Sequence, residues 1–214
     1  MSFKIGKNKM IKYKYHPITK TALEECIVNH INNDKWDLND IDTSEITDMS
    51  YLFRGLYNKY DIEINHDIDI SLWDVSNVTD MENMFAWCDK MTNIDISNWN
   101  VENVKNMFGM FSHCRKLKSV GDLSKWNVSK VQFMDKMFYN CGKLENIGDL
   151  SNWKTTNLED TSEMFCKCFH LYNIGNLDNW NISNIDKMTN MFKETISLKE
   201  NKIPIWYKKY YMIF

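Results

Sequence analysis

Glycine, proline and arginine are scarce in this chain of 214 residues. Only 7 glycines and 2 prolines are present, which excludes a collagen-like or a proline-rich disordered protein. Arginine occurs only as Arg54 and Arg115. No apolar run approaches the ~20 residues of a membrane-spanning helix, and the first residues lack the apolar stretch of a signal peptide. We therefore expect a folded protein with an intracellular location and no membrane span.

Charge is distributed unevenly along the chain. Residues 1–35 carry a net charge of +4 and residues 199–214 carry +3. Because the whole chain carries −3, the segment between them carries −10. Phosphate contacts require a basic surface, so the acidic centre argues against nucleic-acid binding.

Tryptophan recurs at nearly constant spacing through the acidic centre. The intervals are 26, 27, 27 and 27 residues, and the series consists of Trp73, Trp99, Trp126, Trp153 and Trp180. Such a period is typical of a solenoid, whose stacked units share one core. We predict a basic N-terminal segment with a capping helix over residues 1–35, a solenoid of about six repeats over 36–198 and an aromatic C-terminal cap or tail over 199–214.

Each unit has two apolar patterns. Residues three or four positions apart, as in Val78–Cys88, predict a short helix, and Met91–Ile96 predicts a short strand. Ser129 and Gln132 resemble a helix-capping box. Parallel strands lie ~4.8 Å apart whereas packed helices need ~8–10 Å. We therefore expect an α/β repeat protein, a right-handed solenoid that curves with its parallel sheet on the inner face.

The most strictly repeated residues are predicted to form the buried core. They are Trp73, Met81, Met84, Phe85, Cys88, Trp99, Phe111, Cys114, Trp126, Met137, Phe138, Cys141, Trp153, Met164, Phe165, Cys168, Trp180, Met191 and Phe192. Equivalent cysteines should lie ~8–10 Å apart, too far for disulfides and too dispersed for one tetrahedral metal site. We predict no metal and no cofactor. A sugar-binding stripe is the alternative interpretation of the tryptophans, and Trp87, outside the series, is the more plausible exposed contact.

An acidic column follows the predicted strands, comprising Asp69, Asp95, Asp122 and Asp149, with Asn176 after them. Neighbouring carboxylates at strand spacing repel by roughly 1 kcal/mol even in water. Either turn amides satisfy them, which we favour, or they face a basic or calcium-bearing partner. Variable positions on the inner face join this column as candidate partner-binding residues. The set is Thr92, Asn93, Asp95, Lys118, Ser119, Asp122, Glu145, Asn146, Asp149, Tyr172 and Asn173.

The two ends have patterns of their own. Thr21 and Glu24 resemble a capping box at the start of a helix within residues 17–33. This helix is expected to cap the first repeat, with partner recruitment as the alternative. The aromatic segment 203–214 is interpreted as a C-terminal cap, or else as a segment that contacts a partner or a membrane.

The repeated phrase Trp-Asp-Val-Ser-Asn-Val-Thr-Asp-Met-Glu-Asn-Met-Phe of Trp73–Phe85 and the strand phrase Leu-x-x-Leu-x-Leu resemble the BspA-like leucine-rich-repeat surface-protein family. The resemblance extends over roughly residues 40–192. It implies a leucine-rich-repeat-like solenoid and a role in protein interaction or adhesion, with no catalytic residues. We expect a monomeric, non-enzymatic scaffold that binds a protein through its inner face. The alternative is a surface adhesin or carbohydrate-binding module.

Overall fold

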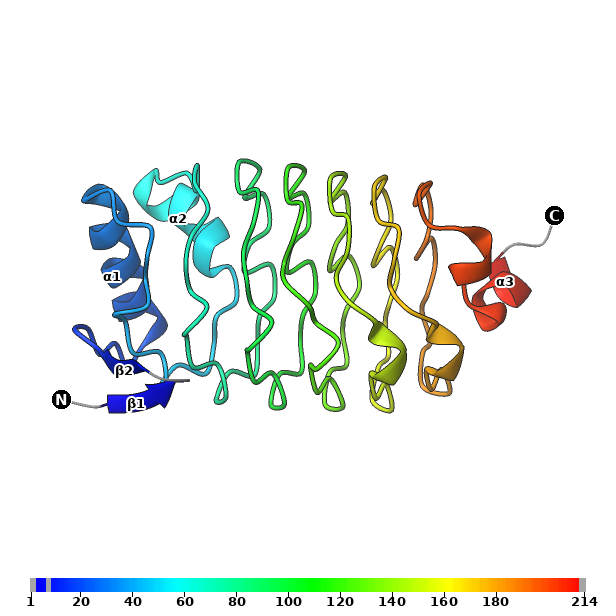
Figure 1. The fold of residues 1–214 in the computed structure, drawn as a ribbon, viewed down its shortest axis with the longest axis horizontal. Helices are drawn as coiled ribbons and strands as arrows, with labels where there is room; N and C mark the ends of the chain where they lie inside the picture. Colours follow the sequence, from blue (N-terminus) through cyan, green and yellow to red (C-terminus); the bar gives the residue numbers. More distant parts are fainter. Residues whose placement is uncertain (1–2, 7–8, 212–214) are drawn as a thin grey trace.

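The repeat units lie side by side in one row, with helices at both ends (Figure 1). The computed structural model describes residues 3–6 and 9–211. The strands β1 (Phe3–Gly6) and β2 (Lys9–Lys12) pair antiparallel at the N-terminal end. The helices are α1 (Lys20–Asn32), α2 (Leu52–Tyr60) and α3 (Ile205–Tyr211), and the 3-10 helices are η1 (Leu150–Asn152), η2 (Leu177–Asn179) and η3 (Glu200–Lys202).

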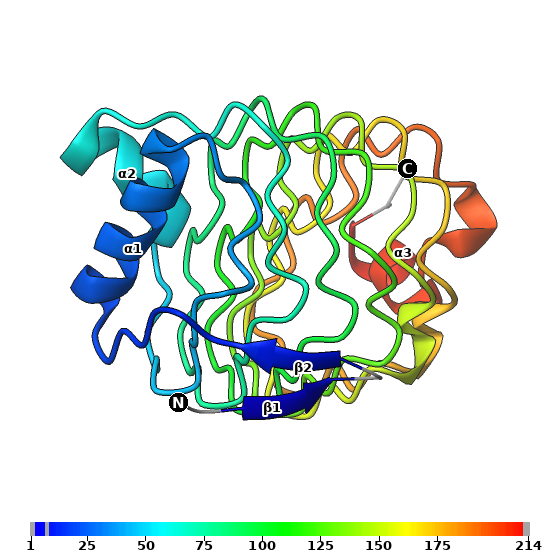
Figure 2. The ribbon, with the colours of Figure 1, turned by 60° about the vertical axis from the view of Figure 1, so that its left-hand side comes forward.

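The helix predicted within residues 17–33 is α1, but its N-cap differs from the predicted one. The Thr19 hydroxyl, rather than that of Thr21, accepts the amide hydrogen bond of Ala22 at 3.2 Å. α1 lies beside α2 (Figures 1 and 2). The buried His30 contacts Asp40 Oδ1 through Nε2 at 2.8 Å. This contact joins the helix to the first repeat unit.

The helix predicted for each repeat is α2 in the unit before Trp73, but in the later units a chain of β-turns takes its place. The amide of Met84 donates to the Met81 carbonyl at 3.2 Å. The third residue of this turn, Asn83, has a positive φ of 50°, which is characteristic of type II turns. Positive φ recurs at two positions in each later unit: Gly109 and His113, Lys136 and Asn140, Glu163 and Lys167, Asn190 and Glu194. For these later units the helix prediction was wrong, because apolar residues three apart also suit successive turns.

Hydrogen bonds between units explain the preference for turns. The amide of Phe85 donates to Met110, and that of Phe111 to Met137, each at 2.8 Å. A helix would use these amides within itself. The turns leave alternate amides free to pair with the next unit. Parallel bridges connect successive members of one column, which we call the turn column: Asp48, Asp80, Asn106, Phe133, Asp160 and Lys187.

The capping box predicted at Ser129 and Gln132 is likewise wrong, because no helix follows it. The amide of Ser129 donates to Asn127 Oδ1 at 3.3 Å, and that of Ser183 donates to Asn181 Oδ1 at 3.0 Å. These are Asx-turns, in which the short side chain imitates a backbone turn. The asparagine two residues before the serine carries the acceptor.

A second column of parallel bridges occupies the position of the predicted strands. It links Asn93, Ser119, Asn146 and Asn173, one residue from each unit. In the described ranges 3–6 and 9–211, only β1 and β2 are extended strands, so the continuous inner sheet was predicted wrongly. Gly148 illustrates the reason. Its φ of 91° turns the chain two residues after the bridge of Asn146.

The row is straight in the view of Figure 1, whereas curvature was predicted. The prediction depended on helices ~8–10 Å apart opposing closely spaced strands. Both columns instead pair through β-bridges, as in Asp80 to Asn106 and Ser119 to Asn146. Equal spacing on the two columns removes the physical cause of the curvature.

Aromatic rings stack in columns through the core. The phenylalanine rings have centroids 5.0 to 6.0 Å apart and form the series Phe53, Phe85, Phe111, Phe138, Phe165 and Phe192. The predicted core residues are all buried. Each repeated tryptophan is at most 4% exposed, so this series does not offer indole faces to a sugar.

Shared carbonyls fix the tryptophan column. Trp153 Nε1 donates to the Leu123 carbonyl at 3.0 Å, and the same oxygen accepts the amide of Trp126 at 3.1 Å. The buried indole N–H is therefore satisfied within the preceding unit, which keeps the ring in one orientation. In the described part of the chain, no helix has the length and apolarity needed to span a bilayer.

Candidate functional site

The predicted partner-binding residues gather along the second bridge column, and we call this set the partner face. Asn93, Ser119, Asn146 and Asn173 form the bridges. The remaining members are their neighbours in sequence. All members of the set are exposed or half-buried.

Two neighbouring hollows mark the partner face. One has a volume of about 450 Å³ and is lined by Ile68, Asp69, Ser71, Asn93, Ile94, Asp95, Ser119 and Gly121. The other, of about 370 Å³, is lined by Lys118, Ser119, Gly121, Asp122, Glu145, Asn146, Gly148 and Tyr172. The two hollows share Ser119 and Gly121. The structure therefore brings residues of five successive units together along one surface.

A row of chemically different side chains, which we call the file, projects from backbone segments that are hydrogen-bonded to one another. The amide of Lys118 donates to the Thr92 carbonyl at 2.7 Å. The amide of Glu145 donates to Lys118 at 3.2 Å, and that of Tyr172 donates to Glu145 at 3.1 Å. Parallel pairing of this kind places neighbours ~4.8 Å apart. A cation, an anion and an aromatic ring are thus held at fixed spacing.

Asp67 lies at the first end of the file, next to Thr92, and was not predicted from the sequence as a residue of this surface. Its Oδ1 accepts the amides of Thr92 at 2.6 Å and Asn93 at 2.9 Å. Burial acts to raise the pKa of Asp67, but the hydrogen bonds from Asn93 and Thr92 outweigh it and lower the pKa. An aspartate 25 residues before Thr92, close to the repeat period, was the available signal.

Turn amides satisfy the acidic column. Asp122 Oδ1 accepts the amide of Ser124 at 2.9 Å, and Asp149 Oδ1 accepts that of Ser151 at 2.9 Å. Side-chain and backbone hydrogen bonds from Ser151 lower the pKa of Asp149. A Cβ on Gly148 would lie 2.0 Å from Asp122 Oδ1. Glycine at this position lets the carboxylate approach the next unit.

The cysteine column is buried and bonded to the main chain. The thiols of Cys114, Cys141 and Cys168 each donate to a phenylalanine carbonyl of the preceding unit at 3.0 Å. Thr195 replaces cysteine in the last unit, and its hydroxyl donates to the Phe165 carbonyl at 3.0 Å. Among the described residues, no three His, Cys, Asp or Glu side chains cluster closely enough to hold a metal.

The family described as "Mycoplasma protein of unknown function, DUF285" matches residues 21–120, 58–171 and 118–206. Overlapping matches of this kind arise because the units resemble one another. No curated protein matches the chain. Among solved structures, a leucine-rich-repeat protein of T. pallidum (TpLRR) is similar at 15% identity, with a TM-score of 0.25, over 57% of this chain and 72% of that chain. With residues 21–206 matched, the chain belongs to the DUF285 repeat family, whose function is unknown.

Proposed function

We propose that this protein is a leucine-rich-repeat-like solenoid that works as a non-enzymatic scaffold and binds a protein through the partner face. The observation that supports this most strongly is the file of Lys118, Glu145 and Tyr172 on successive backbone hydrogen bonds. Exposed side chains that differ in charge and shape, on a backbone that repeats, suit recognition by complementarity. We propose further that the protein is a monomer and that it does not bind nucleic acid.

The shape of the partner face favours a protein over a small molecule. Its two hollows lie next to each other and share lining residues. Protein interfaces cover ~800 Å² on each partner, which requires an extended surface of this kind. Tyr172 is 54% exposed at one end of the file, and tyrosine is among the residues that contribute most to interface affinity.

Side chains of the partner face are poorly suited to acid–base or nucleophilic chemistry. Asp122 and Asp149 are occupied as acceptors of turn amides. The hydrogen bonds of Ser151 lower the pKa of Asp149, so this carboxyl group is ionised near neutral pH and cannot serve as a general acid. These features support a binding role.

Affinity capture with two matched triple variants tests the proposal. The face variant carries Lys118→Glu, Glu145→Lys and Tyr172→Ala. The control carries Lys105→Glu, Glu102→Lys and Phe133→Ala, which change the same charges and remove one partly exposed ring elsewhere. A partner captured by wild type and control but lost by the face variant, at equal thermal stability, supports the proposal. Retention by the face variant contradicts it.

A carbohydrate-binding module at the cell surface is the second candidate, and Trp87 is the observation that favours it. Its indole is 52% exposed, and exposed aromatic rings can pack against sugar rings. Glycan-array binding that disappears on Trp87→Ala or Tyr172→Ala would support this candidate. Binding of a defined protein that survives Trp87→Ala supports the scaffold.

A further inference from the structure

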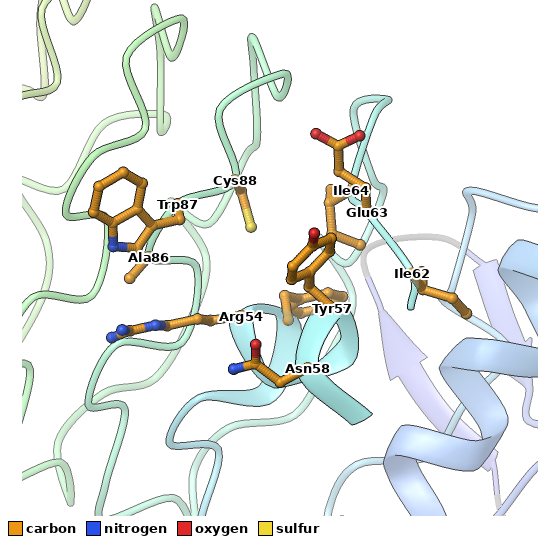
Figure 3. A pocket seen from close by; sticks show the side chains of 10 residues that line it. Arg54, Tyr57, Asn58, Ile62, Glu63, Ile64, Ala86, Trp87 and Cys88 are labelled. Carbon is orange, nitrogen blue, oxygen red and sulfur yellow. The ribbon is translucent and has the colours of Figure 1, made fainter. Parts of the chain in front are cut away.

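A cavity of about 370 Å³ lies where α2 interrupts the regular repeats (Figure 3). None of its lining residues belongs to the partner face. The cavity, which we call the α2 pocket, is lined by Phe53, Arg54, Tyr57, Asn58, Ile62, Glu63, Ile64, Ala86, Trp87 and Cys88. Its volume is within the range of small-ligand sites, ~300–1,000 Å³.

The floor of the α2 pocket is apolar because a helix replaces the turns of the preceding unit. Cys114, one unit further on, donates its thiol hydrogen to the Phe85 carbonyl. For Cys88 the residue equivalent to Phe85 is Phe53, which belongs to α2. The Cys88 thiol points into the cavity (Figure 3). Together with Ile64 and Phe53, which are also buried, it forms a surface suited to an apolar group.

Arg54 gives the rim of the pocket a positive charge. Its side chain extends toward the part of the pocket where Trp87 lies (Figure 3). The other arginine, Arg115, forms an ion pair with Asp89. Across residues 3–6 and 9–211, no ion pair involves Arg54, whose guanidinium lies 5.4 Å from the Tyr51 ring centroid. Glu63, also on the rim, is paired with Lys90 at 2.7 Å.

Trp87 supplies a fixed aromatic wall. Its ring stacks on that of His113 with a centroid separation of 3.9 Å and an interplanar angle of 9°. Tyr139 contacts the same imidazole edge-on at 5.1 Å. The indole is thus supported from the next unit although it is exposed. A ligand ring or aliphatic chain can pack on it without the cost of ordering the side chain.

We infer that the α2 pocket binds an apolar amino-acid side chain that has a carboxylate next to it. The apolar group occupies the floor of Phe53, Ile64 and Cys88, and the carboxylate pairs with Arg54. A guanidinium accepts such a partner in a bidentate fork, which gives orientation as well as affinity. This chemistry is found at the C-terminus of a peptide and where an acidic residue follows an apolar one. The inference concerns a second surface and does not depend on the partner face.

Saturation-transfer NMR with small probes tests the inference on the full chain. N-acetyl-L-phenylalanine should bind with a dissociation constant on the order of 1 mM. Its amide, which lacks the carboxylate, should bind at least ~10-fold more weakly, since a hydrogen bond to a charged group contributes that much. N-acetylglycine, which lacks the ring, should not bind measurably.

Two variants locate the binding. Arg54→Gln should weaken the acid at least ~10-fold and leave the weak binding of the amide unchanged. The control Arg115→Gln removes the charge of the chain's other arginine and should change the binding of neither the acid nor the amide. Equal binding of acid and amide to the wild-type protein overturns the inference without any variant, and so does an Arg54→Gln protein that binds the acid as wild type does.

Further probes distinguish the sources of the carboxylate. The peptide acetyl-Gly-Phe-Asp-Gly-amide carries an internal carboxylate, and acetyl-Gly-Gly-Phe carries a terminal one. Binding of either in an Arg54-dependent manner supports the inference and identifies the source. Absence of binding by both peptides and by N-acetyl-L-phenylalanine at 10-fold above ~1 mM overturns it. N-acetylglucosamine that binds in preference to all of them would overturn it in favour of a sugar site.

Discussion

Trp206 Nε1 donates a hydrogen bond to the main-chain carbonyl of Leu177 at 3.0 Å. The relationship is the one that Trp180 has with Leu150, also at 3.0 Å. α3 therefore continues the tryptophan column one unit beyond its last predicted member. Tyr207 packs edge-on against Phe192, with centroids 5.0 Å apart. The described part of the aromatic tail thus covers the end of the core.

Tyr207→Ala should lower the free energy of unfolding by about 3 kcal/mol, because it removes a buried ring from the end of the core. Tyr210→Ala, whose side chain is 57% exposed, is the matched control and should cost less than ~0.5 kcal/mol. Urea denaturation measures both. Equal, small effects would contradict a capping role and favour a segment that docks a partner.

Phe138→Ala should cost about 3–5 kcal/mol. The side chain is fully buried, and its ring stacks between those of Phe111 and Phe165 at 5.6 and 6.0 Å. Phe133→Ala, in the same unit, removes a ring that is 39% exposed and should cost much less. Chemical denaturation compares the two, and a similar cost for both would argue against a continuous ring column.

The column thiols should resist modification in the folded protein. Burial raises the pKa of Cys141, so less of the reactive thiolate exists at pH 8 than for an ordinary cysteine. A colorimetric thiol titration should find the column cysteines unreactive until urea unfolds the chain, with the half-buried Cys26 the more accessible. Rapid native reaction of two or more buried thiols would contradict their placement.

Asp135 should make stability fall as the pH rises. Burial, followed by the charge of Asp160, raises the pKa of Asp135 from 3.8 to about 6. Between these two pH values the folded state binds more protons at Asp135 than the unfolded state does. The contribution of Asp135 to the free energy of unfolding is therefore largest below pH 3.8 and is lost toward pH 6. Asp135→Asn should remove this loss and be relatively more stable at pH 7 than at pH 4.

Urea midpoints of wild type and Asp135→Asn between pH 4 and pH 7 check this sign. Asp160→Asn is the control for the second cause, since it removes the neighbouring charge while its amide oxygen can still accept the Ser162 amide. In that variant the pKa of Asp135 should be less raised, so the fall in stability should occur at lower pH. A stability difference between Asp135→Asn and wild type that is independent of pH would contradict the raised pKa.

The spacing of identical residues predicted the repeat and its buried columns, because equivalent positions in stacked units must pack alike. It could not predict the local backbone. Residues such as Met81 and Met84 lie on one side of a helix and of a turn chain alike, and the choice depends on hydrogen bonds to the next unit. Spacing also missed the α2 pocket. That cavity arises from the irregular first unit, in which Ile41 occupies the tryptophan position: its amide donates to Leu38 as that of Trp73 donates to Ile70. The long interval between Ile41 and Trp73 was the signal in the sequence.

Trans-hydrogen-bond scalar couplings measured by NMR test the central claim, that turn chains in equivalent units pair directly with one another. The structure predicts correlations from the Phe111 amide nitrogen to the Met137 carbonyl carbon and from Phe138 to Met164. Correlations from the Phe111 amide to the Met107 carbonyl, four residues earlier in the chain, would show a helix and contradict the account.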